Sequence, residues 1–239
     1  MTRTQPTIRL IESTGRREIA AQPPRTAGKV SVDHASFGLS KEVLLRIERP
    51  EINLAVWRRD VPRVIAAWLR MPFAIRLFET RGDIDLQLPA PCVPAFVAAY
   101  FTFEADTDQL AGVSALARDV GELAEIVARL ACNPAVRLRL EWVTDQACRY
   151  FHIDRVPFRL VCTYCGPGTE WVPNDVAAQL TAPESEPAAH DINRLGAGNV
   201  AIMRGSPDRS RVAHAPLRHR SPRIEKPSER RLFLAIDPA

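Results

Sequence analysis

The sequence contains no apolar segment long enough to cross a membrane. A membrane-spanning helix needs about 18–20 consecutive apolar residues, and no such run occurs in the 239 residues. The N-terminal segment MTRTQP carries an early charge, but the apolar stretch of a secretory signal peptide does not follow it. We therefore expect a cytoplasmic protein without a membrane partner.

Cysteines are few, and their number does not fit a disulfide framework. The five cysteines are Cys92, Cys132, Cys148, Cys162 and Cys165. An odd number, widely spread in a chain without a signal peptide, is not the pattern of a disulfide-stabilised secreted domain. A chain of this length can also bury a core without such cross-links. The cysteines thus agree with a cytoplasmic location.

A strong excess of one charge is also missing. The chain has 32 Lys and Arg against 28 Asp and Glu, a net charge of +4, which does not favour nucleic acid as a partner. One interval departs from this balance, because nine cations accompany three acids between Arg204 and Arg231. That interval is either an approach for an anionic substrate or nucleic acid, or a solvated loop face.

The N-terminal part of the chain contains breaker residues and then helical signals. Residues 21–28, rich in Pro and Gly, indicate a flexible tail over residues 1–35, followed by a single domain over residues 36–239. Ser40 and Asp60 stand where helices begin. Apolar residues recur at spacings of four, three, four and three from Leu116, which predicts an amphipathic helix over residues 114–131. The strands predicted in this part are residues 52–57, 73–78 and 85–88.

The pattern changes at about residue 136. Residues 136–142 alternate strictly between apolar and polar, as in a half-buried strand. Glycine- and proline-containing turns separate the later strands, and no strong helical period appears. The further strands predicted are residues 159–164, 200–203 and 232–236. These patterns predict an α+β domain with a β core from about residue 136.

His152 and Asp154 are the first candidate metal ligands. They stand two residues apart in FHID, between two predicted strands. On an extended chain such residues point to the same side, with Cα atoms roughly 6.6–7 Å apart, so both can bind one ion. A third ligand completes a facial triad of two histidines and one carboxylate. His219 is the preferred third ligand, and His214 is the alternative.

A second interpretation of these residues needs no metal. His152 and Asp154 would then be a polar pair in a turn, and His219 a surface residue. The sequence alone leaves this alternative open.

The order of these features resembles the iron(II)/2-oxoglutarate-dependent oxygenases. A His-x-Asp pair, several strands, a late His and an Arg at the start of a final strand follow one another. The resemblance implies a double-stranded β-helix barrel of the jelly-roll or cupin-like kind, flanked by the N-terminal helices. It also implies Fe(II) on the three candidate ligands and 2-oxoglutarate as cosubstrate.

The same resemblance implies residues that bind the cosubstrate. Arg231 would pair with the far carboxylate of 2-oxoglutarate, because a guanidinium binds a carboxylate through two parallel hydrogen bonds. Arg230 is equally reachable. Tyr164 is expected to add a hydroxyl donor.

Several blocks resemble the bacterial family called domain of unknown function 1826. They are FHID at 151–154, GPGTEW at 166–171, HRSP at 219–222 and RLFLAID at 231–237. The likeness covers most of the chain after about residue 40 and implies a link to zinc and other metal homeostasis. The sequence departs from the family at Cys165, where we expect a cation or a larger residue, so the local lining of the pocket is open.

Two other groups have rival interpretations. Cys162 and Cys165 form a single CxxC on a predicted strand, where residues three apart face opposite sides, so the pair does not favour zinc. Glu170 is either the partner of a ligating histidine or a surface carboxylate.

Three functions agree with these features of the sequence. The first is a dioxygenase, an oxidoreductase that uses Fe(II) and 2-oxoglutarate on an unknown small-molecule or protein substrate. The second is a non-catalytic cupin-like protein that binds zinc or another ion in metal homeostasis. The third is a nucleic-acid-associated protein that uses the basic C-terminal loops.

Overall fold

The computed structural model describes residues 33–102, 110–207, 215–225 and 229–239. Residues 1–32 of the predicted tail lie outside the described residues, and so does His214.

The large sheet has seven strands in the order β1-β2-β8-β5-β10-β4-β3. Its first pair, β1 and β2, is parallel, and all its other neighbouring pairs are antiparallel. The strands are β1 (Ala35–Gly38), β2 (Leu54–Trp57), β3 (Ile84–Pro89), β4 (Ala135–Val143), β5 (Phe158–Cys165), β8 (Val200–Arg204) and β10 (Arg231–Pro238). The last strand in sequence, β10, therefore lies inside the sheet between β5 and β4.

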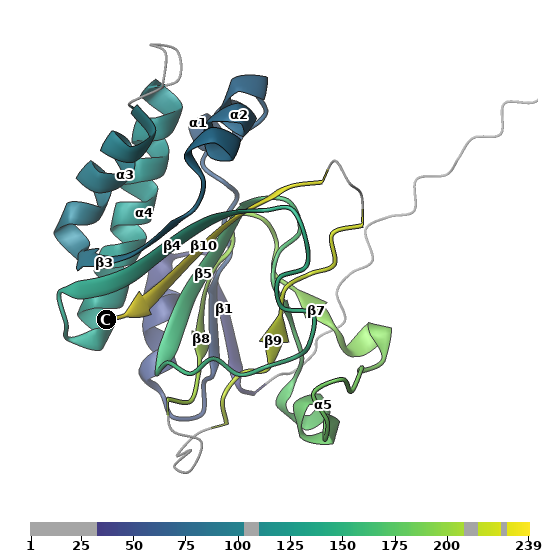
Figure 1. The fold of residues 1–239 in the computed structure, drawn as a ribbon. Helices are drawn as coiled ribbons and strands as arrows, with labels where there is room; N and C mark the ends of the chain where they lie inside the picture. Colours follow the sequence, from purple (N-terminus) through teal and green to yellow (C-terminus); the bar gives the residue numbers. More distant parts are fainter. Residues whose placement is uncertain (1–32, 103–109, 208–214, 226–228) are drawn as a thin grey trace, which may run out of the picture. The chain divides into compact units, whose positions relative to one another are not determined.

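Helices α3 (Val93–Thr102) and α4 (Leu110–Ala131) cover one face of this sheet, which we call the helix face (Figure 1). The predicted stripe of α4 is confirmed, because Leu116, Val120, Leu123 and Val127 are fully buried. They belong to one apolar core with the residues of β4, β5 and β10 that point to the helices. Those residues are Val136, Leu138, Leu140, Leu160, Cys162, Tyr164, Leu232, Leu234 and Ile236.

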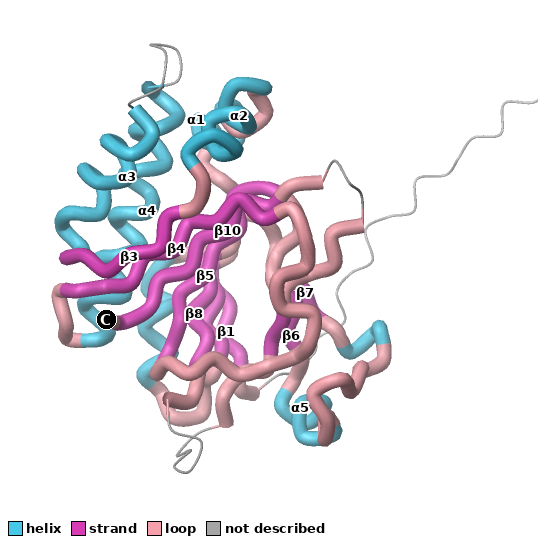
Figure 2. The backbone as a smooth tube through the Cα atoms, in the orientation of Figure 1, coloured by secondary structure: helices cyan, strands magenta, loops and turns pink. Residues whose placement is uncertain are grey.

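A three-stranded sheet lies over the opposite face of the large sheet, which we call the cavity face (Figure 2). Its order is β7 (Asn193–Arg194), β6 (Glu170–Trp171) and β9 (His219–Arg220). A second apolar core joins the two sheets, because Trp171 and Leu217 pack with Val161 of β5 and Ala235 of β10. This core fixes β9 beside the cavity face.

The remaining helices are short. They are α1 (Arg63–Trp68), α2 (Pro72–Arg81), α5 (Asn174–Gln179) and the 3-10 helices Lys41–Glu48, Ala90–Cys92 and Ala189–Asp191. The helices expected after Ser40 and Asp60 are confirmed, although Ser40 makes no side-chain cap and Pro62 occupies the cap of α1.

One expectation about the N-terminal part is corrected and two are confirmed. Residues 73–78 are not a strand, because they lie in α2, whose first residue is Pro72 and whose cap, Gly82, has a φ of 75°. A proline in the first turn and a glycine at the end are typical of a helix. The strands predicted at residues 52–57 and 85–88 are confirmed as β2 and β3.

The structure confirms a mixture of helices and a large antiparallel sheet. The barrel layout of the C-terminal part stays a prediction. Among the described residues, no helix has both the length and the apolar composition to cross a membrane.

Candidate metal centre

The backbone brings His152 and His219 side by side. His219 lies in β9, and the two residues form an antiparallel bridge in which each N–H donates to the other's carbonyl, at 2.9 and 3.1 Å. Their ring centroids are 4.6 Å apart. Two histidines that are far apart in sequence thus become direct neighbours through two main-chain hydrogen bonds.

Asp154 completes a three-residue group. Its Oδ2 lies 3.3 Å from Nε2 of His219, and its Oδ1 lies 3.9 Å from Nε2 of His152. One potential ligand atom from each residue lies within 4.8 Å of the others. The structure therefore brings together the three residues that the sequence singles out.

The two imidazoles present the same nitrogen to the carboxylate. Nδ1 of His152 lies 3.0 Å from the carbonyl of Tyr150, which can only accept, so this nitrogen carries the hydrogen and Nε2 keeps its lone pair. Nδ1 of His219 lies 3.5 Å from the carbonyl of Leu217. Burial and then the neighbouring His219 lower the pKa of His152, which favours the neutral imidazole that binds metals.

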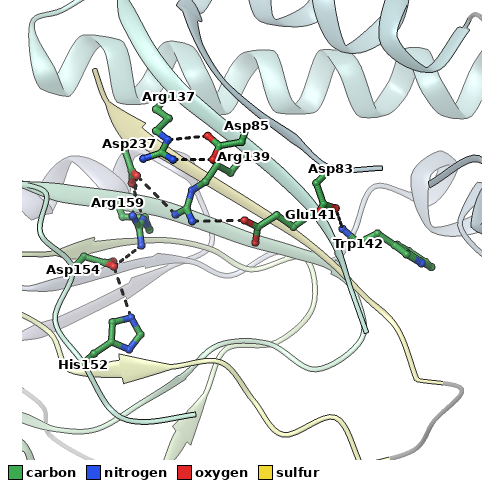
Figure 3. A network of polar contacts seen from close by, with 10 residues as sticks. All are labelled: Asp83, Asp85, Arg137, Arg139, Glu141, Trp142, His152, Asp154, Arg159 and Asp237. Carbon is green, nitrogen blue, oxygen red and sulfur yellow. Dashed lines mark hydrogen bonds and ion pairs between the residues drawn. The ribbon is translucent and has the colours of Figure 1, made fainter. Parts of the chain in front are cut away.

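The Asp154 carboxylate is held in its ionised form. Burial raises the pKa of Asp154, but contact with His219 and the positive charge of Arg159 outweigh burial and bring the pKa to about 2. Arg159 contacts Oδ1 and is itself bound by Asp237 through two hydrogen bonds of 2.7 and 2.8 Å (Figure 3). Arg159 thus ties Asp154 to β10.

The other oxygen of Asp154 shows that the group fits a cation. Oδ2 is buried and, apart from Nε2 of His219 at 3.3 Å, has no polar partner within hydrogen-bond reach among the described residues. An unsatisfied buried carboxylate oxygen is costly, and a metal ion beside it removes that cost. Two imidazole nitrogens and one carboxylate oxygen are also the donor set of the facial triads that hold Fe(II), and they suit zinc as well. His152, Asp154 and His219 therefore fit a divalent transition metal.

A small cavity of about 140 Å³ adjoins the group. His152, His219, Arg220, Thr169 and Arg231 are among its lining residues. This volume equals a few waters, at about 30 Å³ each, which is room for a small organic acid. The large sheet contributes three cations to its lining, Arg139, Arg159 and Arg231, beside Glu141 and several apolar side chains.

Arg231 is an unusual residue of this cavity, because it is only 2% exposed and has no carboxylate partner in the described part of the chain. Its Nη2 donates to the hydroxyls of Thr169 at 2.8 Å and Thr163 at 3.3 Å, whereas its Nε finds no hydrogen-bond partner there. Burial, only partly offset by Glu141, lowers the pKa of Arg231 to about 10. A buried guanidinium without a counter-ion destabilises the protein until an anion binds.

Comparison with known proteins identifies the family. A family model described as "Protein of unknown function (DUF1826)" matches residues 38–237. The chain belongs to this family. No curated protein matches the DUF1826 chain.

Several solved structures align with this DUF1826 protein at low sequence identity. The dioxygenase for auxin oxidation 1 of Arabidopsis thaliana, in complex with 2-oxoglutarate, aligns with a TM-score of 0.50 and 13% identity over 85% of this chain and 91% of its own. The dioxygenase for auxin oxidation of rice aligns with a TM-score of 0.46 and 15% identity over 85% and 81%. HygX of Streptomyces hygroscopicus, with nickel and 2-oxoglutarate bound, aligns with a TM-score of 0.44 and 12% identity over 84% and 88%.

Tyr164 of the DUF1826 chain does not lie in the small cavity. Its side chain points to the helix face, and its hydroxyl donates to Oδ2 of Asp119 at 2.6 Å. Strand alternation instead presents its neighbour Thr163 to Arg231. The expectation of a Tyr164 donor in the cavity is therefore wrong.

The choice between the two adjacent arginines also follows from strand alternation. Arg230 precedes β10 and donates to the carbonyl of Glu229, and it is not among the residues that line the small cavity. Arg231 is the one whose guanidinium enters the cavity from β10.

Glu170 fits neither of its two interpretations. It is buried and pairs with Arg194 and with Arg220, at 2.8 Å in the second pair. Burial raises the pKa of Glu170, but the hydrogen bonds from these arginines lower it by more, so the pKa lies below its usual value. Its role is to hold Arg220 at the edge of the small cavity.

Cys162 and Cys165 do not form a metal site among the described residues. Both thiols are free, and the one metal-binding group found there is that of His152, Asp154 and His219. Burial raises the pKa of Cys162 to about 12, which keeps the thiol protonated and inert.

Proposed function

We propose that the protein is an iron(II)/2-oxoglutarate-dependent oxygenase. The observation that carries the proposal is that the two histidines of the His-Asp-His group line the same cavity as Arg231, a buried arginine without an ion-pair partner among the described residues. A fold shared with a dioxygenase in complex with 2-oxoglutarate supports it. We also propose that the seven- and three-stranded sheets are the two sides of a double-stranded β-helix.

His152, Asp154 and His219 would hold the iron, leaving coordination positions open. Iron(II) held by such a triad supplies the site at which non-haem oxygenases activate dioxygen. The chain's own contribution is to favour the neutral imidazole at His152, to keep Asp154 ionised through His219 and Arg159, and to bury Asp154 and His219.

Arg231 would bind the distal carboxylate of 2-oxoglutarate. Its Nε lacks a partner among the described residues, and the guanidinium is held in place by Thr163 and Thr169, so it can pair with a carboxylate without reorganisation. The stacked Phe233 ring, 4.1 Å from the guanidinium carbon, fixes the plane of the group. Binding an anion here removes the cost of the buried charge.

A protein that only stores or transports metal would use the same three ligands. It would gain nothing from a buried arginine in the cavity beside them. The Arg231 cavity is therefore the observation that favours the oxygenase over a metal-homeostasis role.

Calorimetric titration of 2-oxoglutarate into anaerobic, Fe(II)-loaded protein tests the proposal. We expect saturable binding that Arg231→Met weakens by about tenfold or more, since a charge-assisted pair is lost. The matched control is Arg230→Met, one residue away and outside the cavity, which should leave the affinity unchanged. No binding to the parent protein, or equal loss in both variants, contradicts the proposal. Succinate formation from 2-oxoglutarate in air then tests turnover.

A further inference from the structure

A second and larger cavity lies on the other side of His152. Its volume is about 450 Å³, and His152 is a lining residue of both cavities. The His152 side chain is 36% exposed, so a molecule in the larger cavity can contact it. Small-molecule sites usually have volumes of about 300–1,000 Å³, so the larger cavity fits a compact organic molecule.

The wall of the larger cavity is apolar and well supported. Phe151 and Leu180 are buried lining residues, and they form a separate apolar core with Val172 beneath the wall. Arg218 donates from Nη1 to the carbonyl of Leu180 at 3.0 Å, which ties the segment after α5 to the strand that carries His219. The wall is therefore a preformed surface.

The charged side chains among the described lining residues of this cavity are cationic. Arg155 and Arg218 are its lining cations, and no Asp or Glu is among its described lining residues. Ser206 adds a hydroxyl to the lining. A concave surface that combines apolar side chains with positive charge attracts anions and holds an apolar body.

We propose that this cavity binds the substrate, and that the substrate is an organic anion with an apolar body. The inference rests on the proposed function, because His152 joins the cavity to the candidate metal centre. Arg155 and Arg218 would hold the anionic group, and Phe151, Leu180 and Pro216 would contact the apolar part next to His152.

Two fluorescent probes with the same ring system test the charge preference. 8-Anilinonaphthalene-1-sulfonate is an aromatic anion, and N-phenyl-1-naphthylamine has the same rings without the sulfonate. In the full-length protein, the double variant Arg155→Gln/Arg218→Gln should weaken binding of the anion by about tenfold or more and change binding of the neutral probe less than about twofold. The control, Arg223→Gln, removes an exposed cation outside both cavities. Equal affinities of the double variant and the control for the anion overturn the proposal.

A filling variant tests where the probes bind. Ala182 lines the cavity, so Ala182→Trp should displace both probes. Ala188→Trp introduces the same side chain at an exposed position of the same segment, outside the lining, and should displace neither. Probe binding that survives Ala182→Trp shows attachment elsewhere and rejects the assignment.

Co(II) binding, measured in the same variants, separates the two proposals. If Co(II) still binds but removal of the two arginines does not weaken binding of the anionic probe, the proposed substrate class is wrong and the proposed function stands. If the parent protein binds no Co(II), the proposed function fails, whatever the probes do.

Discussion

The two faces of the large sheet differ in chemistry although they are built from the same strands, because the helix face is apolar and the cavity face combines apolar side chains with buried ions. In β10, Leu232, Leu234 and Ile236 point to the helix face, whereas Arg231 and Asp237 point to the cavity face. The same alternation runs along β4 and β5, where Arg139 and Arg159 emerge on the cavity face (Figure 3). Residue parity in a strand therefore separates the residues that stabilise the fold from those that form the site.

The energetic consequences of the two faces should differ accordingly. The helix face is a continuous apolar core, whose burial stabilises the fold by about 25 cal/mol per Å². The cavity face contains buried ions, and burial of ions contributes little stability or even opposes it. Substitutions on the helix face should change the free energy of unfolding, and substitutions on the cavity face should change ligand binding.

The largest stability effect is expected on the helix face. Leu138 is fully buried against the helices. Leu138→Ala should lower the free energy of unfolding by about 2–5 kcal/mol, because it leaves a cavity in a packed core. Urea denaturation measures this loss. The folded Leu138→Ala protein should still bind one equivalent of Co(II). Loss of metal binding in the folded variant would contradict the view that the helix face contributes to stability and not to the metal centre.

Arg159→Met should have a smaller effect on stability and a larger one on the metal centre. It removes the partner of Asp154 and leaves Asp237 with fewer hydrogen bonds. We expect the affinity for Co(II) to fall by about 10–100-fold, as for other residues that orient a metal ligand. The free energy of unfolding should fall by about 1–3 kcal/mol.

Arg137→Met is the matched control for Arg159→Met. Arg137 makes an equivalent two-bond pair with Asp85 on the same sheet, at 2.8 Å for both bonds, but that pair is about half exposed and does not contact Asp154 (Figure 3). Arg137→Met should lower the free energy of unfolding by at most about 1 kcal/mol and leave the Co(II) affinity unchanged. Similar Co(II) affinities of the two variants would show that Arg159 does not position Asp154.

The smallest stability effect is expected at Arg231. Its guanidinium is buried without a counter-ion among the described residues, so Arg231→Met should leave the free energy of unfolding unchanged or raise it. Thermal or urea unfolding in the absence of 2-oxoglutarate measures this. Loss of a buried hydrogen-bonded group can lower the free energy of unfolding by more than about 2 kcal/mol. A decrease of that size in Arg231→Met would mean that Arg231 has a structural role.

The candidate ligands could be predicted because their signals are local or ordered along the chain. His152 and Asp154 stand at strand spacing, and His219 precedes the final strand at the expected place. The helix at residues 110–131 has an unambiguous period. These features do not depend on knowing which strands are neighbours.

The residues that support the site could not be predicted from such signals. Arg159 and Asp237 look like ordinary strand residues until β5 and β10 are paired, and these two strands lie far apart in sequence. The face of Tyr164 could not be predicted either, because β5 is buried on both faces and its sequence does not indicate which face carries the site. The short apolar run in α2 fits a strand or a helix equally, and only Pro72 and Gly82 decide it.

The metal content of the purified protein tests the central claim most directly. Elemental analysis after loading with Fe(II) or Co(II) and desalting should give about one equivalent in the parent protein and almost none in Asp154→Asn or His219→Ala. His190→Ala removes an exposed histidine that also lies beside an aspartate, Asp191, and should keep the full equivalent. Equal metal content in the parent protein, Asp154→Asn and His219→Ala would contradict a metal centre at these residues.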